Sequence, residues 1–90
     1  MVNGIRLAIN NNVDIINISV GCLKGSNQLE NVIKEAIQKD IIIVASAGNY
    51  MSDSLMYPAA YDKVIAVGSL DRKGKIISPK GKVDKSIIYL

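Results

Sequence analysis

The sequence has no histidine, and its only cysteine is Cys22. Without histidine, the commonest general base near neutral pH is missing from these 90 residues. A single cysteine cannot form an internal disulfide, and a zinc site would have to be built from carboxylates alone. We therefore expect no cofactor and no structural metal.

Aromatic residues are also scarce, because the chain has four tyrosines and no tryptophan or phenylalanine. Basic residues exceed acidic ones by 11 to 8, and six of the basic residues fall between Arg72 and Lys85. No tyrosine is interleaved with this basic run, as a platform for stacking bases would require. We expect a solvated tail here and no binding to nucleic acid.

Long apolar runs are absent as well, and no stretch approaches the roughly 20 apolar residues of a membrane span. Near the N-terminus, residues 10–12 are all asparagine and Asp14 follows, which interrupts the apolar residues that a signal peptide needs. We therefore expect no membrane span, and a chain expressed alone is expected in the cytoplasm.

What the sequence does contain is an alternation of helical and strand-like patterns. Between residues 3 and 12, apolar side chains recur at helical spacing. Residues 14–19 form a β-branched run that is typical of a buried strand. A second helix is predicted after Ser26 or Asn27, with Glu30 as the capping-box partner of Asn27. Its apolar stripe consists of Leu29, Val32, Ile33, Ala36 and Ile37.

Two further strands complete the pattern, at residues 41–45 and 64–68, with loop chemistry between Ser46 and Pro58. The run at 41–45 does not alternate, which predicts a strand covered on both faces. Strand, helix, strand, loop and strand in this order predict an α/β fold: part of a three-layer parallel β-sheet with crossover helices.

Two strand ends carry the informative motifs, Asn-Ile-Ser-Val-Gly at residues 17–21 and Ala-Ser-Ala-Gly-Asn at residues 45–49. In an open parallel sheet, sites are built at the carboxyl ends of the strands. Small residues in the second motif would let the backbone approach a ligand closely. Asn49 at the sheet edge could donate an N–H to a developing oxyanion.

At these motifs the chain resembles the subtilisin-like serine proteases, and the resemblance continues through Tyr-Pro-Ala-Ala-Tyr at 57–61 and Val-Ile-Ala-Val-Gly-Ser-Leu-Asp at 64–71. Within that family it is similar to the lantibiotic leader peptidases. The resemblance implies that residues 1–71 are part of a subtilisin-like peptidase domain. Residues 72–90 are a divergent, Lys-rich tail whose apolar end is a candidate for one further strand.

The resemblance also implies a role for each motif in binding a peptide or protein substrate. Two backbone segments would form opposite walls of the primary specificity pocket, and the first would pair with the substrate as an added strand. These segments are Ser19, Val20 and Gly21 on one side and Ser46, Ala47 and Gly48 on the other. Asn49 would be the oxyanion-hole donor, which stabilises charge that exists only in the tetrahedral intermediate.

Departures from the family pattern limit what the chain is expected to do. The family's Asp and His precede the helix at Asn3 and its nucleophilic Ser follows the strand at 64–68, so the 90 residues lack the triad and are expected to be inactive alone. Met56 stands where many relatives have a small residue at the floor of the pocket, and Tyr50 and residues 77–82 also differ. By resemblance, the whole enzyme would be secreted or held at the cell surface.

Two other functions stay open at this point. A non-enzymatic remnant would act by self-association or by complementing another fragment, because a partial sheet leaves apolar surface uncovered. A nucleotide-binding α/β module would fit the alternating pattern. However, residues 21–26 have neither the dinucleotide nor the Walker spacing of glycines.

Overall fold

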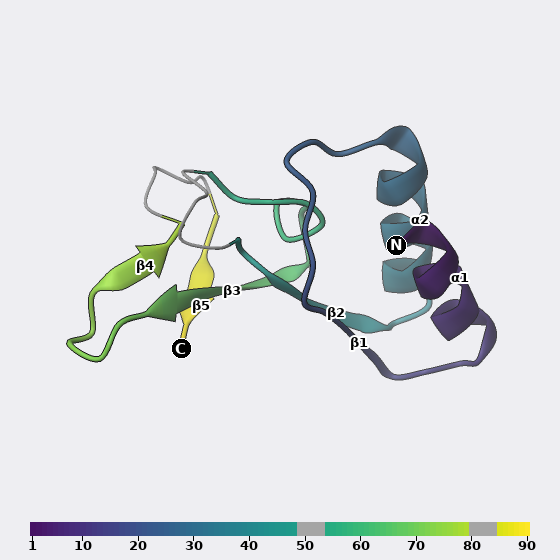
Figure 1. Cartoon of the computed structure of the whole chain (residues 1–90). Helices are drawn as coiled ribbons and strands as arrows, with labels where there is room; N and C mark the ends of the chain where they lie inside the picture. The colour runs from purple at the N-terminus through teal and green to yellow at the C-terminus, as the bar shows by residue number, and fades with distance from the viewer. Residues whose placement is uncertain (49–53, 80–84) are drawn as a thin grey trace.

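The computed structural model describes residues 1–48, 54–79 and 85–90, in which two helices alternate with the first two strands and three further strands follow (Figure 1). The predicted helices and the three predicted strands are confirmed, with bounds shifted by one or two residues. The elements are α1 (Val2–Asn10), β1 (Ile15–Ile18), α2 (Asn27–Gln38), β2 (Ile42–Ser46), β3 (Ile65–Leu70), β4 (Ile76–Ser78) and β5 (Ile87–Tyr89).

The N-terminus of α2 is capped by Ser26, whose Oγ accepts a hydrogen bond from the main-chain N–H of Leu29 at 3.1 Å. This satisfies one of the N–H groups that the first turn of a helix leaves without a partner. The predicted capping box of Asn27 and Glu30 is wrong, because Asn27 is already the first helical residue. Glu30 instead lies in the first turn, where its charge is favourable to the helix dipole.

The strands form one mixed sheet in which parallel pairs predominate. The order is β1-β2-β3-β4, with β5 paired to β3. Register is set by pairs such as Ile16 with Ile43 and Ala45 with Ala66, and β1, β2, β3 and β5 run parallel to one another. Only β4 is antiparallel among the described strands. This architecture confirms the predicted α/β class, with α2 as the crossover between β1 and β2.

Both helices lie on the same side of β1 and β2 (Figure 1). The hydrophobic core forms between the helices and this covered face of the sheet, which makes two layers. Its buried side chains include Ile5 and Ile9 of α1, Leu29, Val32, Ile33 and Ala36 of α2, and Ile16, Ile18, Ile43, Ala45 and Ala66 of the strands.

The opposite face of the sheet is uncovered in the described part of the chain. Four isoleucines on it, one from each parallel strand, are between 39% and 59% exposed: Ile15, Ile42, Ile65 and Ile88. We call this surface the open face. The prediction that the strand at 41–45 is covered on both faces is therefore wrong for these residues. A continuous apolar run indicates that both faces of the strand are apolar. It does not indicate that other segments of the same chain pack against both faces.

The Lys-rich tail contributes two strands to the sheet, so it is more ordered than a solvated tail. β4 follows a turn in which Asp71 Oδ1 accepts hydrogen bonds from the main-chain N–H groups of Lys73 and Lys75. Lys85, just before β5, has its ammonium bound to three carbonyl groups. For Lys85 the prediction of a solvated side chain is wrong.

Gly68 lies where β3 is flanked by both β4 and β5, and its lack of a side chain is required by space. A Cβ there would come within 2.6 Å of the main-chain oxygen of Ser78 and 2.7 Å of the Tyr89 ring. We expect Gly68→Ala to lower the free energy of unfolding by about 1–3 kcal/mol, the usual cost of overpacking. Urea denaturation followed by circular dichroism measures this.

Gly4 provides the matched control for this substitution. It lies in α1, and a Cβ there would meet nothing within 4 Å. Gly4→Ala should therefore leave the stability unchanged or raise it by up to about 1 kcal/mol, because alanine is the better helix former. A Gly68→Ala protein as stable as the Gly4→Ala protein would contradict the packing argument.

Candidate functional site

The two sequence motifs meet at one edge of the sheet. Since β1 and β2 are parallel neighbours, residues 19–21 and 46–48 leave the sheet on the same side. Ser19 and Ser46 line the same concavity of about 310 Å³. The full lining is Asn17, Ile18, Ser19, Val44, Ala45, Ser46, Val67 and Leu90. The structure therefore brings the first residue of each predicted segment to one concavity, whereas Val20, Gly21, Ala47 and Gly48 are not among its lining residues.

The first segment, residues 19–21, continues beyond β1 as exposed backbone. Ser19 is exposed, and the side chain of Val20 is 61% exposed. Within the described part of the chain, none of the main-chain groups of Ser19, Val20 and Gly21 forms a hydrogen bond with another main-chain group. Such an unpaired stretch can accept an added strand from another chain.

The second segment, residues 46–48, is held more firmly. Ala47 is fully buried, its N–H donates to Val67 O at 2.8 Å, and its carbonyl accepts from Met56 N at 2.9 Å. Gly48 has a φ of 145°, a conformation that other residues rarely adopt. Glycine at this position is thus required by the backbone, and the segment is fixed to β3 on one side and to Met56 on the other.

Residues 56–57, which we call the floor segment, are bonded to the second wall and to the residue that follows the first. Tyr57 and Cys22 exchange two main-chain hydrogen bonds, both of 2.8 Å. Met56 N at the same time donates to Ala47 O. Because Cys22 directly follows the first wall, the spacing between the end of that wall and the second wall depends on the position of residues 56–57.

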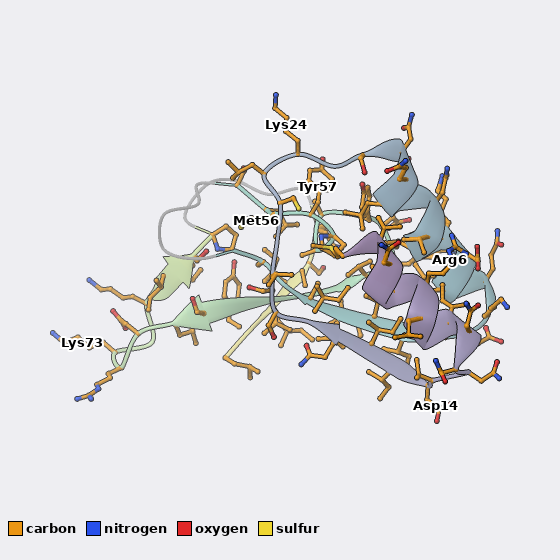
Figure 2. All side chains as sticks on the ribbon, turned by 45° about the vertical axis from the view of Figure 1, so that its right-hand side comes forward. Arg6, Asp14, Lys24, Met56, Tyr57 and Lys73 are labelled. Carbon is orange, nitrogen blue, oxygen red and sulfur yellow. The ribbon has the colours of Figure 1, made fainter. Side chains whose placement is uncertain are left out.

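The side chain of Met56 occupies space beside Gly21, and Figure 2 shows Met56 next to the segment that leads from β1 to α2. A Cβ on Gly21 would be 2.9 Å from Met56 Cβ and 3.3 Å from Met56 Cε. The floor is therefore filled by a thioether side chain on the side of the first wall.

Tyr61 packs against Tyr57 of the floor segment, a contact that the sequence did not predict. The rings of Tyr57 and Tyr61 are 4.9 Å apart between centroids, a favourable tilted arrangement. The Tyr61 hydroxyl accepts from Ser26 N and donates to Ser26 O, both at 3.2 Å. Burial raises the pKa of Tyr61 above its ordinary value, although the bond from Ser26 opposes this shift, so the phenol stays protonated at neutral pH.

Gly25 was the only sequence signal for the packing of Tyr57 and Tyr61 against the loop before α2. A Cβ on Gly25 would lie 2.5 Å from the Tyr61 hydroxyl and 3.1 Å from the Tyr57 ring. A glycine in a loop is, however, common for many reasons, so it does not identify its neighbour. Cys22, which pairs with Tyr57 through its main chain, has an exposed side chain with a free thiol, as expected of an incidental surface cysteine.

Asn49 and Tyr50 lie outside the described residues. The geometry of the expected oxyanion donor therefore stays a prediction. The described residues reach the end of β2 and Gly48, which immediately precedes Asn49 in the sequence.

Comparison with known sequences decides the family. The sequence profile of the subtilase family matches residues 1–85. The chain belongs to the subtilase family. Among curated subtilases, subtilisin E of Bacillus subtilis (strain 168) is 41% identical over 75 residues, which cover 79% of this chain and 20% of the relative. The thermostable alkaline protease of Halalkalibacterium halodurans is 43% identical over 72 residues, covering 80% and 20%.

Solved structures of subtilase-like maturation proteases agree with the fold. The prenylagaramide maturation protease PagA superposes with a TM-score of 0.77 at 30% identity, over 92% of this chain and 31% of that one. The patellamide maturation protease PatA gives a TM-score of 0.73 at 38% identity, over 83% and 29%. The closer likeness to lantibiotic leader peptidases stays a prediction.

This subtilase chain spans about a fifth of the length of the curated relatives that it matches. The family match gives no support to the nucleotide-binding alternative. The match also extends beyond Asp71, where the sequence analysis placed the end of the peptidase domain, but that boundary stays a prediction. Neither described helix has the length and apolar character that crossing a membrane requires.

Proposed function

We propose that this chain supplies the substrate-binding part of a serine endopeptidase site. In this proposal Ser19, Val20 and Gly21 pair with the substrate backbone as an added strand. The second wall, residues 46–48, closes the other side of the specificity pocket. Asn49 donates to the oxyanion of the tetrahedral intermediate.

The observation that carries the proposal is the floor segment, which is bonded to the second wall and to Cys22, the residue after the first wall. Among residues 1–48, 54–79 and 85–90, the first wall leaves its main chain unpaired, whereas the second is bonded to both β3 and Met56. A slot with one open, strand-like side and one fixed side is suited to hold an extended peptide in a single register. The subtilase membership supports peptide-bond hydrolysis as the reaction that such a slot serves.

We further propose that the 90 residues alone do not hydrolyse peptide bonds. The chain has no histidine, and a serine hydroxyl is a weak nucleophile without an adjacent base. The purified chain is therefore expected to show no hydrolysis of a chromogenic peptide above buffer. Measurable hydrolysis that Asn49→Ala abolishes would contradict this.

A hybrid enzyme tests the binding role directly. In it, the stretch of subtilisin E that aligns with this chain is replaced by the corresponding residues of this chain. The rest of subtilisin E supplies the catalytic triad. We expect the hybrid enzyme to hydrolyse peptides, with a side-chain preference that follows the grafted chain. A folded hybrid enzyme that binds no peptide inhibitor would overturn the proposed role.

The open face favours a second candidate function, association with another copy or with a complementary fragment. Its four isoleucines form a continuous apolar surface, because Ile15 pairs with Ile42 and Ile65 and Ile88 follow on adjoining strands. Contiguous apolar surface on a soluble protein marks an interaction site or an aggregation hazard. We therefore propose that the isolated chain self-associates through this face.

Substitution of Ile42 measures this association. Ile42 is 50% exposed at the centre of the open face, so Ile42→Lys should shift the chain toward monomer in sedimentation equilibrium at micromolar concentration. Leu7→Lys is the matched control, since Leu7 is 64% exposed on α1, away from the sheet. A well-folded wild-type monomer under these conditions would exclude self-association.

A further inference from the structure

The side chain of Lys85 reaches from the start of β5 into a ring of main-chain oxygens. Its Nζ donates to Ala59 O at 2.8 Å, to Tyr61 O at 2.7 Å and to Val64 O at 2.7 Å. An ammonium group has three N–H donors and no acceptor, so these carbonyls satisfy all of its hydrogen-bonding capacity. A neutral amine would leave one of the three oxygens without its donor.

Two of the three residues that present these oxygens are buried, and the third, Tyr61, is partly buried. Ala59 is fully buried and Val64 is 3% exposed. Burial lowers the pKa of Lys85, and the nearby carboxylate of Asp62 opposes this shift. Hydrogen bonds from a charged donor to buried carbonyls are among the stronger ones in proteins, and unmade ones are costly.

The same turn is bonded directly to the floor segment. Ala60, between two of the bound carbonyls, donates its N–H to Met56 O at 2.8 Å. Met56 then donates to Ala47 O, and Tyr57 exchanges two bonds with Cys22. A chain of contacts therefore runs from Lys85 through the 59–64 turn to the second wall and to Cys22, the residue that follows the first wall.

We propose that Lys85 is a positioning residue, an internal cation that closes the 59–64 turn and so fixes the floor segment between the two walls. Lys85 touches neither wall and acts only through the turn. Its role in substrate selection rests on the proposed function, whereas its effect on residues 56–57 does not. An experiment can therefore contradict the role in substrate selection without contradicting the effect on residues 56–57, and the reverse.

Amide hydrogen exchange of the ¹⁵N-labelled 90-residue chain tests the positioning. Lys85→Met keeps most of the side-chain length and removes all three donors. We expect the amides of Met56, Tyr57 and Ala60 to exchange at least about tenfold faster, since each lost bond to a charged donor is worth that factor or more. Core amides such as Val32 and Ile43 should keep their protection.

Lys73→Met is the matched control, because Lys73 is exposed in the turn before β4 and its labelled side chain in Figure 2 projects away from the molecule. It should leave the floor amides unchanged. If Lys85→Met speeds exchange equally throughout the chain, or nowhere, the positioning role is wrong. If it speeds exchange only at the floor segment and its turn, the role stands.

Chemical rescue separates a specific cation site from loss of packing. Lys85→Ala leaves a space that propylammonium can enter, and this ion should restore protection at Met56 and Tyr57. Propanol has a similar shape and no charge, so it should not. Rescue by both compounds, or by neither, would show that a charged donor at this place is not what holds the floor.

A peptide titration then distinguishes the two proposals. A blocked peptide with small side chains should shift the resonances of Ser19, Val20 and Gly21 in the wild-type chain, and more weakly in Lys85→Met. If the wild-type chain binds no peptide but the exchange results hold, the proposed function fails and the positioning by Lys85 stands. If peptide binds equally well to both proteins, Lys85 does not affect substrate binding.

Discussion

Replacing Asn49 by alanine in the hybrid enzyme should lower kcat by about two to three powers of ten and change KM little. This magnitude is the one known for the oxyanion-hole asparagine of a subtilisin, so it is borrowed from a relative of this chain. The physical reason is that the donor meets a full negative charge only in the tetrahedral intermediate, and therefore stabilises the transition state more than the bound substrate. Steady-state kinetics with a chromogenic peptide measure both constants.

Two further variants make this test specific. Asn49→Asp keeps the shape of the side chain but replaces the N–H donor by an acceptor, so it should be at least as harmful as Asn49→Ala. Asn31→Ala, on the exposed surface of α2, should leave both constants unchanged. A loss confined to KM would mean that Asn49 binds the ground state and is not an oxyanion donor.

Widening the floor of the slot should change which peptides are cleaved. Met56 lies against Gly21, so Met56→Gly removes the side chain that fills this part of the slot. A large apolar substrate side chain that becomes buried there gains about 1.5–3 kcal/mol. We therefore expect kcat/KM for a substrate with phenylalanine before the scissile bond to rise about 10- to 100-fold relative to one with alanine.

Met56→Leu is the matched control for this prediction. Leucine has a similar volume, and swaps that conserve volume in packed sites have small effects. The ratio of the two kcat/KM values should therefore stay close to that of the unmodified hybrid enzyme. If Met56→Gly leaves that ratio unchanged as well, Met56 does not limit the depth of the pocket.

The two predictions also differ in the kinetic step that they address. Asn49 acts on a charge that forms during the reaction, whereas Met56 acts on the space offered to the substrate before it. A hybrid enzyme with both substitutions should therefore show nearly additive losses and gains, provided that the two side chains do not contact each other.

Local sequence determined the elements and the edge of the sheet at which the proposed site lies. The helical spacing of Leu29, Val32, Ile33 and Ala36 places these side chains on one face of α2, and all four are buried. Small residues after β2 predicted a close approach of the backbone to a ligand, whereas the two walls were predictions from the resemblance to the subtilisin-like proteases. These signals are local, since they depend on a residue and its neighbours within two turns.

Contacts between distant residues were decided by the tertiary structure alone. The pairing of Cys22 with Tyr57 joins residues 35 positions apart, and Lys85 reaches carbonyls 21 to 26 positions earlier in the chain. Nothing in the immediate neighbourhood of either residue specifies its partner. A lysine in a basic run is most simply solvated, and only the packing of β5 against β3 brings this one to the 59–64 turn.

The packing on the two faces of the sheet also separates what local sequence determines from what the tertiary structure decides. The sequence by itself determined that the strand at 41–45 is apolar on both faces, because every residue in the run is apolar. Only the tertiary structure decided that the helices cover one face and leave Ile42 half exposed on the other. Apolar character is a property of each residue, whereas burial depends on which distant segment of a chain, or which other chain, packs against it.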